Sequence, residues 1–202
     1  MDKKVILCFI GRSGCGKDTI VNKFLSQNEK FNKLVPLTSR PKRDYEVDGI
    51  DYIFKSKSEM QQLISQNNLM EHRQYCVHNE GKNDVWYYGT PYPTSNYSVM
   101  INTLNMYCML KWKYRNVIDI YPIYITLDEE ELLYRAITRE SKNSNPNYRE
   151  LSRRFFADKN DYSNSKIAHA MELGDFDCIV ENYDLDKAVN KINKYVKDTI
   201  LI

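Results

Sequence analysis

The feature that most constrains this chain is the stretch ILCFIGRSGCGKDTI at residues 6–20. A short apolar run with β-branched members is followed at once by a glycine-rich turn, a lysine and an amphipathic segment. The run VILCFI predicts a buried parallel strand, and the segment from about Lys17 to Ser26 predicts a helix. A strand and a helix joined in this way favour an α/β fold built on a parallel sheet.

The turn Gly11–Lys17 fits the pattern G-x-x-x-x-G-K, and its place between a strand and a helix identifies it as a phosphate-binding P-loop. Backbone N–H groups of such a loop point toward phosphate oxygens, and the following helix adds its positive dipole end. Lys17 would bridge the β- and γ-phosphates of a nucleoside triphosphate. The alternative is an ordinary glycine turn with a surface lysine. That alternative does not explain why the strand, the glycine spacing and the helix occur together. The predicted phosphate contacts are Gly11, Ser13, Gly14, Cys15, Gly16 and Lys17.

Asp18 follows the lysine at a position where a serine or threonine hydroxyl usually binds Mg²⁺. Three interpretations remain open. Asp18 binds the metal directly or through water, as a hard oxygen donor can; Thr19 replaces the hydroxyl after a small shift; or Asp18 only favours the helix N-terminus and activity is lost. Because a carboxylate beside a triphosphate repels it unless a metal intervenes, we predict that Asp18 binds Mg²⁺ through water. Thr19 would then contact a phosphate oxygen.

Composition limits the remaining possibilities. The 202 residues, 42% of them hydrophobic, are enough for one α/β domain with a small inserted lobe. The net charge of +2 gives no global basic field, which argues against DNA or RNA as a partner. Five scattered cysteines without a C-x-x-C pair indicate reduced intracellular thiols. No apolar run is long enough for a signal peptide or a membrane span, so we expect a cytoplasmic protein without membrane contact.

The rest of the chain alternates between predicted strands and helices, which implies a parallel sheet with helices on both faces. The predicted strands after the P-loop are YSVMIN, YPIYITL and FDCIV, and the predicted helices are TLNMYCMLKW, EEELLYRAITRE, YRELSRRFFADKNDYSNSKIAHA and a last one ending near Lys197. Asp128 and Asp184 are expected to cap the helices that follow them. KNSNPN is expected to be a loop.

Residues 36–90 break this alternation and predict a separate, mostly antiparallel lobe. Its elements are a helix from about Ser58 to Gln66, capped by Ser56 or Ser58, and a hairpin of LMEHRQYCV and VWYYG with NEGKND at its tip. Within this lobe, Arg40 and Arg43 flank a Pro-Lys pair. Two guanidinium groups can bind one dianion, such as a phosphate, through paired hydrogen bonds. A basic turn exposed to solvent would explain the same residues.

Taken with the P-loop, this stretch resembles the guanylate kinase family. TSRPKRDYEVDGIDYIF is similar to the family signature T-T-R-x-P-R-x-G-E-x-[DN]-G-x-D-Y-x-F, and the resemblance continues at LME, YYGT, ELLYRAITR, RRFFADKND and IVENYDLDKA. It implies a P-loop NTPase core with a parallel sheet flanked by helices, a small mostly antiparallel lobe that binds the nucleoside monophosphate, and a helical lid. It also implies one domain divided into a core (1–35, 96–135 and 168–202), a lobe (36–95) and a lid (136–167).

The resemblance implies a reaction as well. The family transfers the γ-phosphoryl group of ATP to GMP or dGMP with Mg²⁺ as the cofactor, so the expected partners are ATP and a nucleoside monophosphate, with a monomer or homodimer as the assembly. The implied acceptor contacts are Arg40, Arg43, Tyr52 and Tyr88 for the phosphate, and Glu71, Thr90 and Asn102 for the base. The implied ATP contacts beyond the loop are Arg135 and Asn182, and the implied catalytic residues are Lys17, Arg43, Arg139 and Arg154.

Several departures from the family pattern leave the base open. Pro36 stands where the family has a serine that touches the base, and Asn102 stands where an acid helps to read guanine. The segment after Thr90 is too short for the family's connecting helix, and VHNEGKNDVW is longer than the family's turn. Glu71 still favours guanine, because a carboxylate pairs with the adjacent N1–H and N2–H donors.

Two other functions therefore remain as alternatives. One is a P-loop kinase that acts on another phosphorylated acceptor, such as a different nucleotide or a ribose phosphate. The other is a non-catalytic guanylate-kinase-like binding module, although such modules typically lose the P-loop lysine and Lys17 is present. A regulatory GTPase is disfavoured because the chain has no N-K-x-D motif for reading the base.

Overall fold

A parallel five-stranded sheet forms the centre of the computed structural model, which describes residues 3–43, 46–79, 82–142, 146–172, 176 and 178–200. The strand order is β2-β7-β1-β8-β9. The strands are β1 (Lys4–Ile10), β2 (Asn32–Lys33), β7 (Tyr97–Ile101), β8 (Ile118–Thr126) and β9 (Cys178–Glu181). Since β1 lies between β7 and β8, the loop that follows it emerges near the middle of the carboxyl edge of the sheet.

Both faces of this sheet are buried, which explains why β1 is a continuous apolar run. Leu7 and Phe9 pack into one buried cluster, whereas Ile6 and Cys8 pack into another, because successive side chains of a strand point to opposite faces. The predicted parallel sheet flanked by helices is thereby confirmed.

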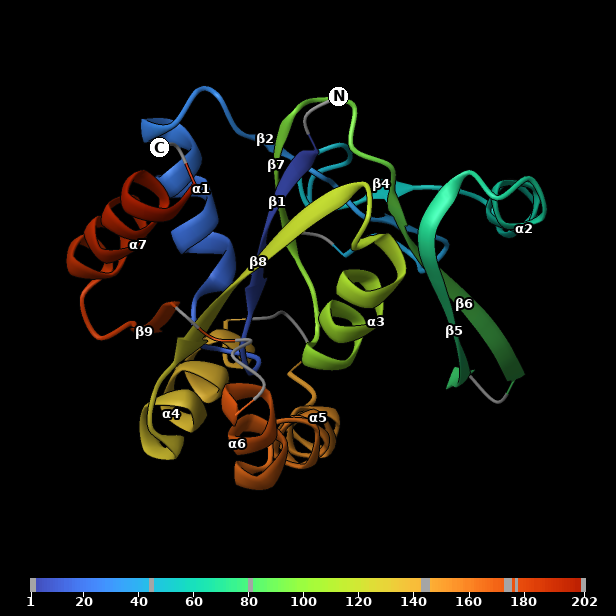
Figure 1. Cartoon of the computed structure of the whole chain (residues 1–202). Coiled ribbons are helices and arrows are strands. Elements are labelled where there is room, and N and C mark those ends of the chain that lie inside the picture. Colours follow the sequence, from blue (N-terminus) through green and yellow to red (C-terminus); the bar gives the residue numbers. More distant parts are fainter. Residues whose placement is uncertain are drawn as a thin grey trace.

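Three helices cover the two faces of the sheet (Figure 1). They are α1 (Lys17–Gln27) and α7 (Leu185–Thr199) on one face and α3 (Leu104–Tyr114) on the other. The side chain of Asp184 accepts hydrogen bonds from the N–H groups of Asp186 and Lys187 at the start of α7, as predicted. Beyond it, α7 buries an apolar stripe against α1 and the sheet: Ala188, Val189, Ile192 and Val196.

A second sheet lies beside α3, on the side away from α1 and α7 (Figure 1). Its strand order is β4-β3-β6-β5, with antiparallel pairing except between β3 and β4. Its elements are β3 (Leu37–Thr38), β4 (Ile53–Phe54), β5 (Leu69–Asn79), β6 (Lys82–Pro91) and the helix α2 (Lys57–Ser65). Ser56 caps α2 in a reciprocal capping box with Glu59, which decides between the two predicted caps.

The hairpin of β5 and β6 is longer than predicted. Its ladder continues as far as the pair Asn79 and Lys82, so most of the segment expected at the tip belongs to the strands. Backbone hydrogen bonding does not depend on side-chain polarity, which is why a polar pattern concealed these pairs. The remaining tip residues, 80 and 81, lie outside the described residues.

Three helices gather at the end of the sheet where β1 and β8 finish (Figure 1). They are α4 (Glu129–Glu140), α5 (Tyr148–Asp161) and α6 (Asn164–Glu172). Asp128 caps α4 as predicted, since its carboxylate accepts the Glu131 N–H. The predicted single helix over 148–170 is divided in two between Asp161 and Asn164, where the buried Tyr162 stacks on Tyr124. Residues 143–145 of the expected KNSNPN loop lie outside the described residues.

Among the described residues, no helix combines the length and the apolar character needed to cross a membrane.

Candidate active site

The loop Gly11–Lys17 connects β1 directly to α1, and glycine is required at both of its ends. A Cβ atom on Gly11 would overlap the Ile125 carbonyl oxygen, and one on Gly16 would overlap the Asn182 amide. Gly16 also has a φ of 86°, in the left-handed region that glycine adopts without strain, and it caps the N-terminus of α1. The chain therefore turns sharply enough for the loop's N–H groups and the first turn of α1 to meet at one place.

The ammonium group of Lys17 lies against its own loop. Its Nζ donates to the carbonyl oxygens of Gly11 at 2.7 Å and Arg12 at 3.0 Å. These bonds hold a positive charge beside the loop's N–H groups, where an anion would gain from both. The predicted role of Lys17 in binding phosphate requires this arrangement.

A carboxylate already contacts one of the loop's N–H groups. The backbone N–H of Ser13 donates to Oδ2 of Asp158, on α5, at 2.5 Å. The Arg12 guanidinium lies over the Phe155 ring, 4.8 Å from its centroid, and bonds to Glu129 at 3.0 Å. Helix α5 therefore lies over the loop, and the loop can receive an anionic oxygen.

Two more predicted residues pack against the other side of the loop. Asn182 is buried, and its side-chain Nδ2 donates to the Cys15 carbonyl at 2.8 Å. Arg135 on α4 donates to the Asn182 carbonyl at 3.0 Å and to Glu131 at 2.6 Å. The structure thus gathers Arg135, Asn182 and the loop, although they are widely separated in the sequence.

The candidate metal ligands, Asp18 and Thr19, are exposed in the first turn of α1. Both side chains offer the oxygen atoms that Mg²⁺ prefers, so this donor set fits a magnesium ion held jointly with phosphates. In the described residues, no group of three or more histidine, cysteine or acidic side chains could hold a metal by itself.

The arginine cluster of the second sheet is organised by a residue outside the predicted site, Glu46. Its Oε1 pairs with Arg40 Nη2 at 2.7 Å, and its Oε2 accepts the Arg43 backbone N–H at 2.8 Å. Arg40 and Glu46 are each only 6% exposed, whereas the Arg43 side chain is exposed. Glu46 therefore fixes both the Arg40 guanidinium and the turn that carries Arg43.

Two tyrosines complete this cluster. The Arg40 guanidinium lies 5.4 Å from the centroid of the Tyr52 ring, and Tyr52 and Tyr88 meet edge to face. Burial raises the pKa of the Tyr52 hydroxyl, with smaller effects from neighbouring charges that include Asp18 of α1. Arg40, Tyr52 and Tyr88 therefore form one cluster of hydrogen-bond donors.

The predicted base contacts Glu71 and Thr90 are adjacent across β5 and β6, and both are buried. The Thr90 hydroxyl donates to Glu71 Oε1 at 2.6 Å, so it orients the carboxylate. On the other side, Arg73 Nε lies 3.3 Å from Glu71 Oε2. Neither Glu71 Oε2 nor Arg73 Nε has a hydrogen-bond partner among the described residues.

Asn102 follows the last residue of β7, and its N–H donates to the Phe9 carbonyl at the end of β1. It is 6% exposed and therefore lies in the interior at the carboxyl edge of the sheet. Met100 and Leu104, two residues before and after it, pack in the same buried cluster as Met70, the neighbour of Glu71.

The two remaining predicted arginines lie on α4 and α5. Arg139 is exposed, one helical turn after Arg135. Arg154 is partly buried, with Nη2 3.9 Å from Oε2 of the buried Glu140. Both arginines belong to the group of helices at the carboxyl end of the sheet, where the P-loop also lies.

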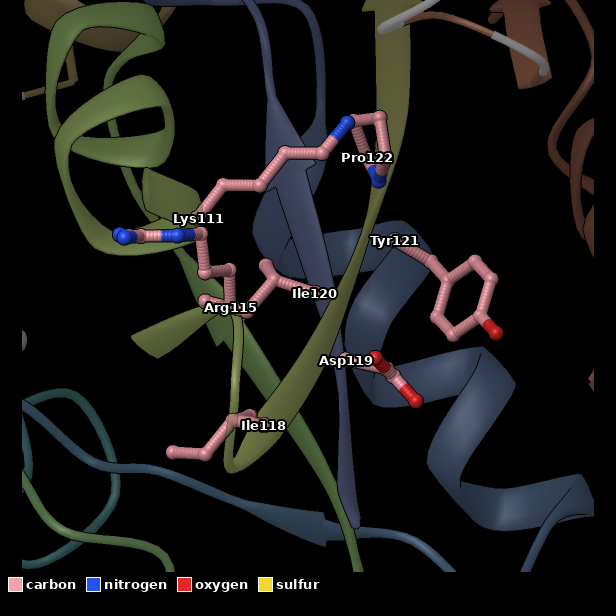
Figure 2. Close-up of a pocket in the computed structure, with 7 residues that line it drawn as sticks. All are labelled: Lys111, Arg115, Ile118, Asp119, Ile120, Tyr121 and Pro122. Carbon is pink, nitrogen blue, oxygen red and sulfur yellow. The ribbon is translucent and has the colours of Figure 1, made fainter. Parts of the chain in front are cut away.

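A separate hollow of about 330 Å³ lies between the end of α3 and the start of β8 (Figure 2). Figure 2 shows Lys111 and Arg115 on one side of β8, with Asp119 and Tyr121 pointing to the other. Asp119 is paired with Lys3 at 3.0 Å. The hollow lies at the amino end of β8, whereas the P-loop lies at the carboxyl ends of the strands, so it is not part of this site.

A P-loop on a parallel sheet, combined with an arginine and tyrosine cluster on a second sheet, defines a P-loop nucleoside monophosphate kinase. The comparisons with known proteins identify the family within this class. The guanylate kinase family model matches residues 1–90. Guanylate kinase of Mycoplasmoides gallisepticum is 30% identical over 200 residues, which cover 95% of this chain and 91% of that protein. The chain belongs to the guanylate kinase family.

Other comparisons agree with this assignment. Guanylate kinase of Oceanobacillus iheyensis is 38% identical over 90 residues, which cover 45% of this chain and 40% of that protein. The crystal structure of guanylate kinase from Anaplasma phagocytophilum matches 97% of this chain and 86% of its own with a TM-score of 0.65. At 21% identity, that match shows the shared fold.

Three residues that shape this site are missing from the sequence prediction: Glu46, Arg73 and Asp158. Glu46 carried a signal, since an acid close after two arginines is a candidate partner for them. Arg73 lies two residues after Glu71 and therefore on the same face of a strand, which the predicted hairpin could have indicated. Asp158 carried no such signal, because its contact with Ser13 joins residues 145 positions apart.

Proposed function

We propose that this protein transfers the γ-phosphoryl group of ATP to GMP or dGMP, giving ADP and GDP or dGDP. The observation that carries the proposal is that the chain holds two sites suited to anions, the P-loop with Lys17 before α1 and the cluster of Arg40, Tyr52 and Tyr88 beside the second sheet. A phosphoryl transfer between two nucleotides requires two polyanions held in line with each other.

The chain divides, in this proposal, into parts with separate tasks. Residues 1–35, 96–135 and 168–202 form the core that binds ATP, residues 36–95 form the lobe that binds the acceptor, and residues 136–167 form the lid. The bond of Ser13 to Asp158 and the packing of Arg12 on the Phe155 ring support a lid that meets the P-loop. Closure of lobe and lid would exclude water from the transferring phosphoryl.

The acceptor's phosphate would be held by Arg40, Arg43, Tyr52 and Tyr88, and its base by Glu71, Thr90 and Asn102. Guanidinium pairs bind phosphate with two parallel hydrogen bonds, and tyrosine hydroxyls add further donors. Among the described residues, one oxygen of the Glu71 carboxylate has no hydrogen-bond partner, so it could accept N1–H of the base. Burial of Arg40 against Glu46 keeps its charge oriented before the acceptor binds.

The donor ATP would bind the P-loop residues Gly11, Ser13, Gly14, Cys15, Gly16, Lys17 and Thr19, with Arg135 and Asn182 beside them. Catalysis would then come from positioning and charge rather than from a side-chain nucleophile. Lys17, Arg43, Arg139 and Arg154 would stabilise negative charge on the transferring phosphoryl as the lobe and lid close.

Mg²⁺ is the proposed cofactor, with Asp18 as its ligand through water. When bound, the ion would neutralise charge on the β- and γ-phosphates. We expect Asp18→Ser to keep or raise the turnover number with Mg-ATP, because serine supplies the hydroxyl ligand usual at this position. The measurement is steady-state turnover across a magnesium titration. An inactive Asp18→Ser protein that is still folded would refute metal binding as the role of this carboxylate.

Asp158 lies where a phosphate oxygen of ATP would accept the Ser13 N–H. We expect Asp158→Asn to tighten ATP binding by about threefold, because it removes a negative charge beside the triphosphate. The dissociation constant for ATP can be measured by calorimetry without the acceptor. Asp161→Asn, an exposed position on the same helix, serves as the charge-matched control. Weaker ATP binding in Asp158→Asn alone would show that Asp158 assists the nucleotide instead.

The test of the proposed function is a coupled ADP-release assay with Mg-ATP against GMP, dGMP, AMP, CMP, UMP and dTMP. Turnover with GMP and dGMP supports the proposal. Turnover only with another acceptor would identify a different P-loop kinase. Nucleotide binding without turnover on any acceptor would identify a non-catalytic binding module.

A further inference from the structure

The side chain of Asn102 presents a hydrogen-bond donor, and no described residue accepts from it. Its Oδ1 accepts the backbone N–H of Thr103 at 2.9 Å. Only the amide oxygen can accept that bond, so the orientation of the amide is fixed and Nδ2 is the free end. Nδ2 is buried and has no hydrogen-bond partner within the described residues.

The start of α3 keeps the amide in this orientation. Thr103 is the N-cap of α3, and its hydroxyl accepts the Met106 N–H while its own N–H is bonded to Asn102. Turning the amide over would leave the Thr103 N–H without its acceptor. Buried donors are almost always paired in native proteins, so we expect Nδ2 to donate to an acceptor on a ligand.

A second pair of groups, Glu71 and Arg73, also has buried polar atoms without partners in the described residues, and Met70 beside Glu71 packs in the same cluster as Met100 and Leu104, which flank Asn102. Both side chains point from the same face of β5, and a donor, Arg73 Nε, lies beside an acceptor, Glu71 Oε2, at 3.3 Å. A guanidinium next to a carboxylate is complementary to a carbonyl next to an N–H group. The C6 carbonyl and N1–H of a 6-oxopurine have this arrangement, whereas adenine has the opposite one.

We propose that the acceptor pocket takes 6-oxopurine nucleoside monophosphates that lack a 2-amino group, namely those of hypoxanthine and xanthine, alongside GMP. The inference rests on the proposed function and assigns the base-reading edge to three residues: Glu71, Arg73 and Asn102. The first two recognise the edge that all 6-oxopurines share. Asn102 presents its Nδ2 donor toward C2 of the base. The 2-amino group of guanine is also a donor, so the two groups cannot form a hydrogen bond with each other.

The 2-oxo group of xanthine can accept a hydrogen bond from Asn102 Nδ2. Hypoxanthine has only a hydrogen at C2, so it places no donor against Nδ2. An acid at this position would have the reverse preference, because a carboxylate accepts from the guanine amine. With asparagine at residue 102, the pocket therefore lacks the preference for the 2-amino group of guanine that an acid would give.

The test compares kcat/KM for GMP, IMP and XMP in the natural protein and in Asn102→Asp. We expect IMP and XMP to be phosphorylated by the natural protein with kcat/KM within about tenfold of the value for GMP, since no carboxylate at residue 102 accepts the amine. In Asn102→Asp the preference for GMP over IMP should rise by about 10- to 100-fold, the value of one hydrogen bond to a charged group. XMP should lose activity in this variant.

Asn105→Asp is the matched control, because it adds the same charge at an exposed position of α3. It should leave the ratios among the three acceptors unchanged. Strong rejection of IMP and XMP by the natural protein would overturn the inference while leaving the proposed function intact. Absence of turnover with every acceptor would overturn both. An Asn102→Asp protein that folds with unchanged ratios would show that residue 102 does not face the base.

Discussion

Replacement of Lys17 by alanine is expected to lower kcat by about 10²–10³-fold, the usual effect of removing one preorganised donor from a charged transition state. The ammonium group lies against the Gly11 and Arg12 carbonyls, beside the N–H groups of the loop. No other lysine of the loop can replace it, because the segment from Gly11 to Gly16 contains none. The assay is single-turnover and steady-state phosphorylation of GMP.

The structural consequences of this substitution should be small, because Lys17 bonds only to its own loop and forms no ion pair with a described residue. Thermal unfolding of Lys17→Ala should therefore follow that of the natural protein. Lys191→Ala, at an exposed position of α7, controls for loss of a lysine from a helix. A Lys17→Ala protein with natural kcat would refute the assignment of this loop to the transferring phosphates.

The second large effect is expected for Glu46→Gln. This change leaves Arg40 buried without a countercharge, which typically costs about 3–5 kcal/mol of folding free energy. The Arg40–Glu46 bond is 2.7 Å long, and both side chains are nearly inaccessible to water. Urea unfolding measures the loss, and the KM for GMP should rise because Arg40 and the turn of Arg43 are no longer held. Glu29→Gln removes the same charge from an exposed position and should have little effect.

The same pair gives stability a defined dependence on pH. Burial alone would raise the pKa of the Glu46 carboxyl, but the hydrogen bonds from Arg40 and the Arg43 N–H outweigh it and hold the pKa below its ordinary value. The stabilisation is therefore complete above the ordinary pKa of a glutamate and is lost as the pH falls through the lowered folded value. Unfolding free energies measured from neutral to acidic pH should fall less steeply in Glu46→Gln. An identical slope in both proteins would contradict this cause.

The elements that sequence predicts well here are those with local determinants. The strand, loop and helix around Gly11–Lys17 follow from apolar periodicity and glycine spacing, and Asp128 and Asp184 cap their helices as their positions imply. The pairing of Arg40 with Tyr52 has local support too, because both belong to one short motif.

What the sequence does not reveal depends on contacts between distant segments. The bond between Ser13 and Asp158 requires the helices at the carboxyl edge to fold over the loop. The role of Asn102 depends on one hydrogen bond: the sequence places this residue among the base contacts, whereas in the structure its amide oxygen already accepts the Thr103 N–H and only the nitrogen is left for a ligand. Neither the orientation of an amide nor a contact across 145 positions follows from periodicity or motif spacing.

The central claim is that two nucleotides bind at once, with their phosphates meeting between the P-loop and the cluster of Arg40, Tyr52 and Tyr88. The most direct test is the affinity for a bisubstrate analogue in which adenosine and guanosine are joined through five phosphates, measured by calorimetry beside ATP and GMP alone. If the two sites face each other as proposed, the linked compound should bind at least about 100-fold more tightly than either nucleotide, because its second half binds intramolecularly. Binding no tighter than that of ATP alone would contradict the account.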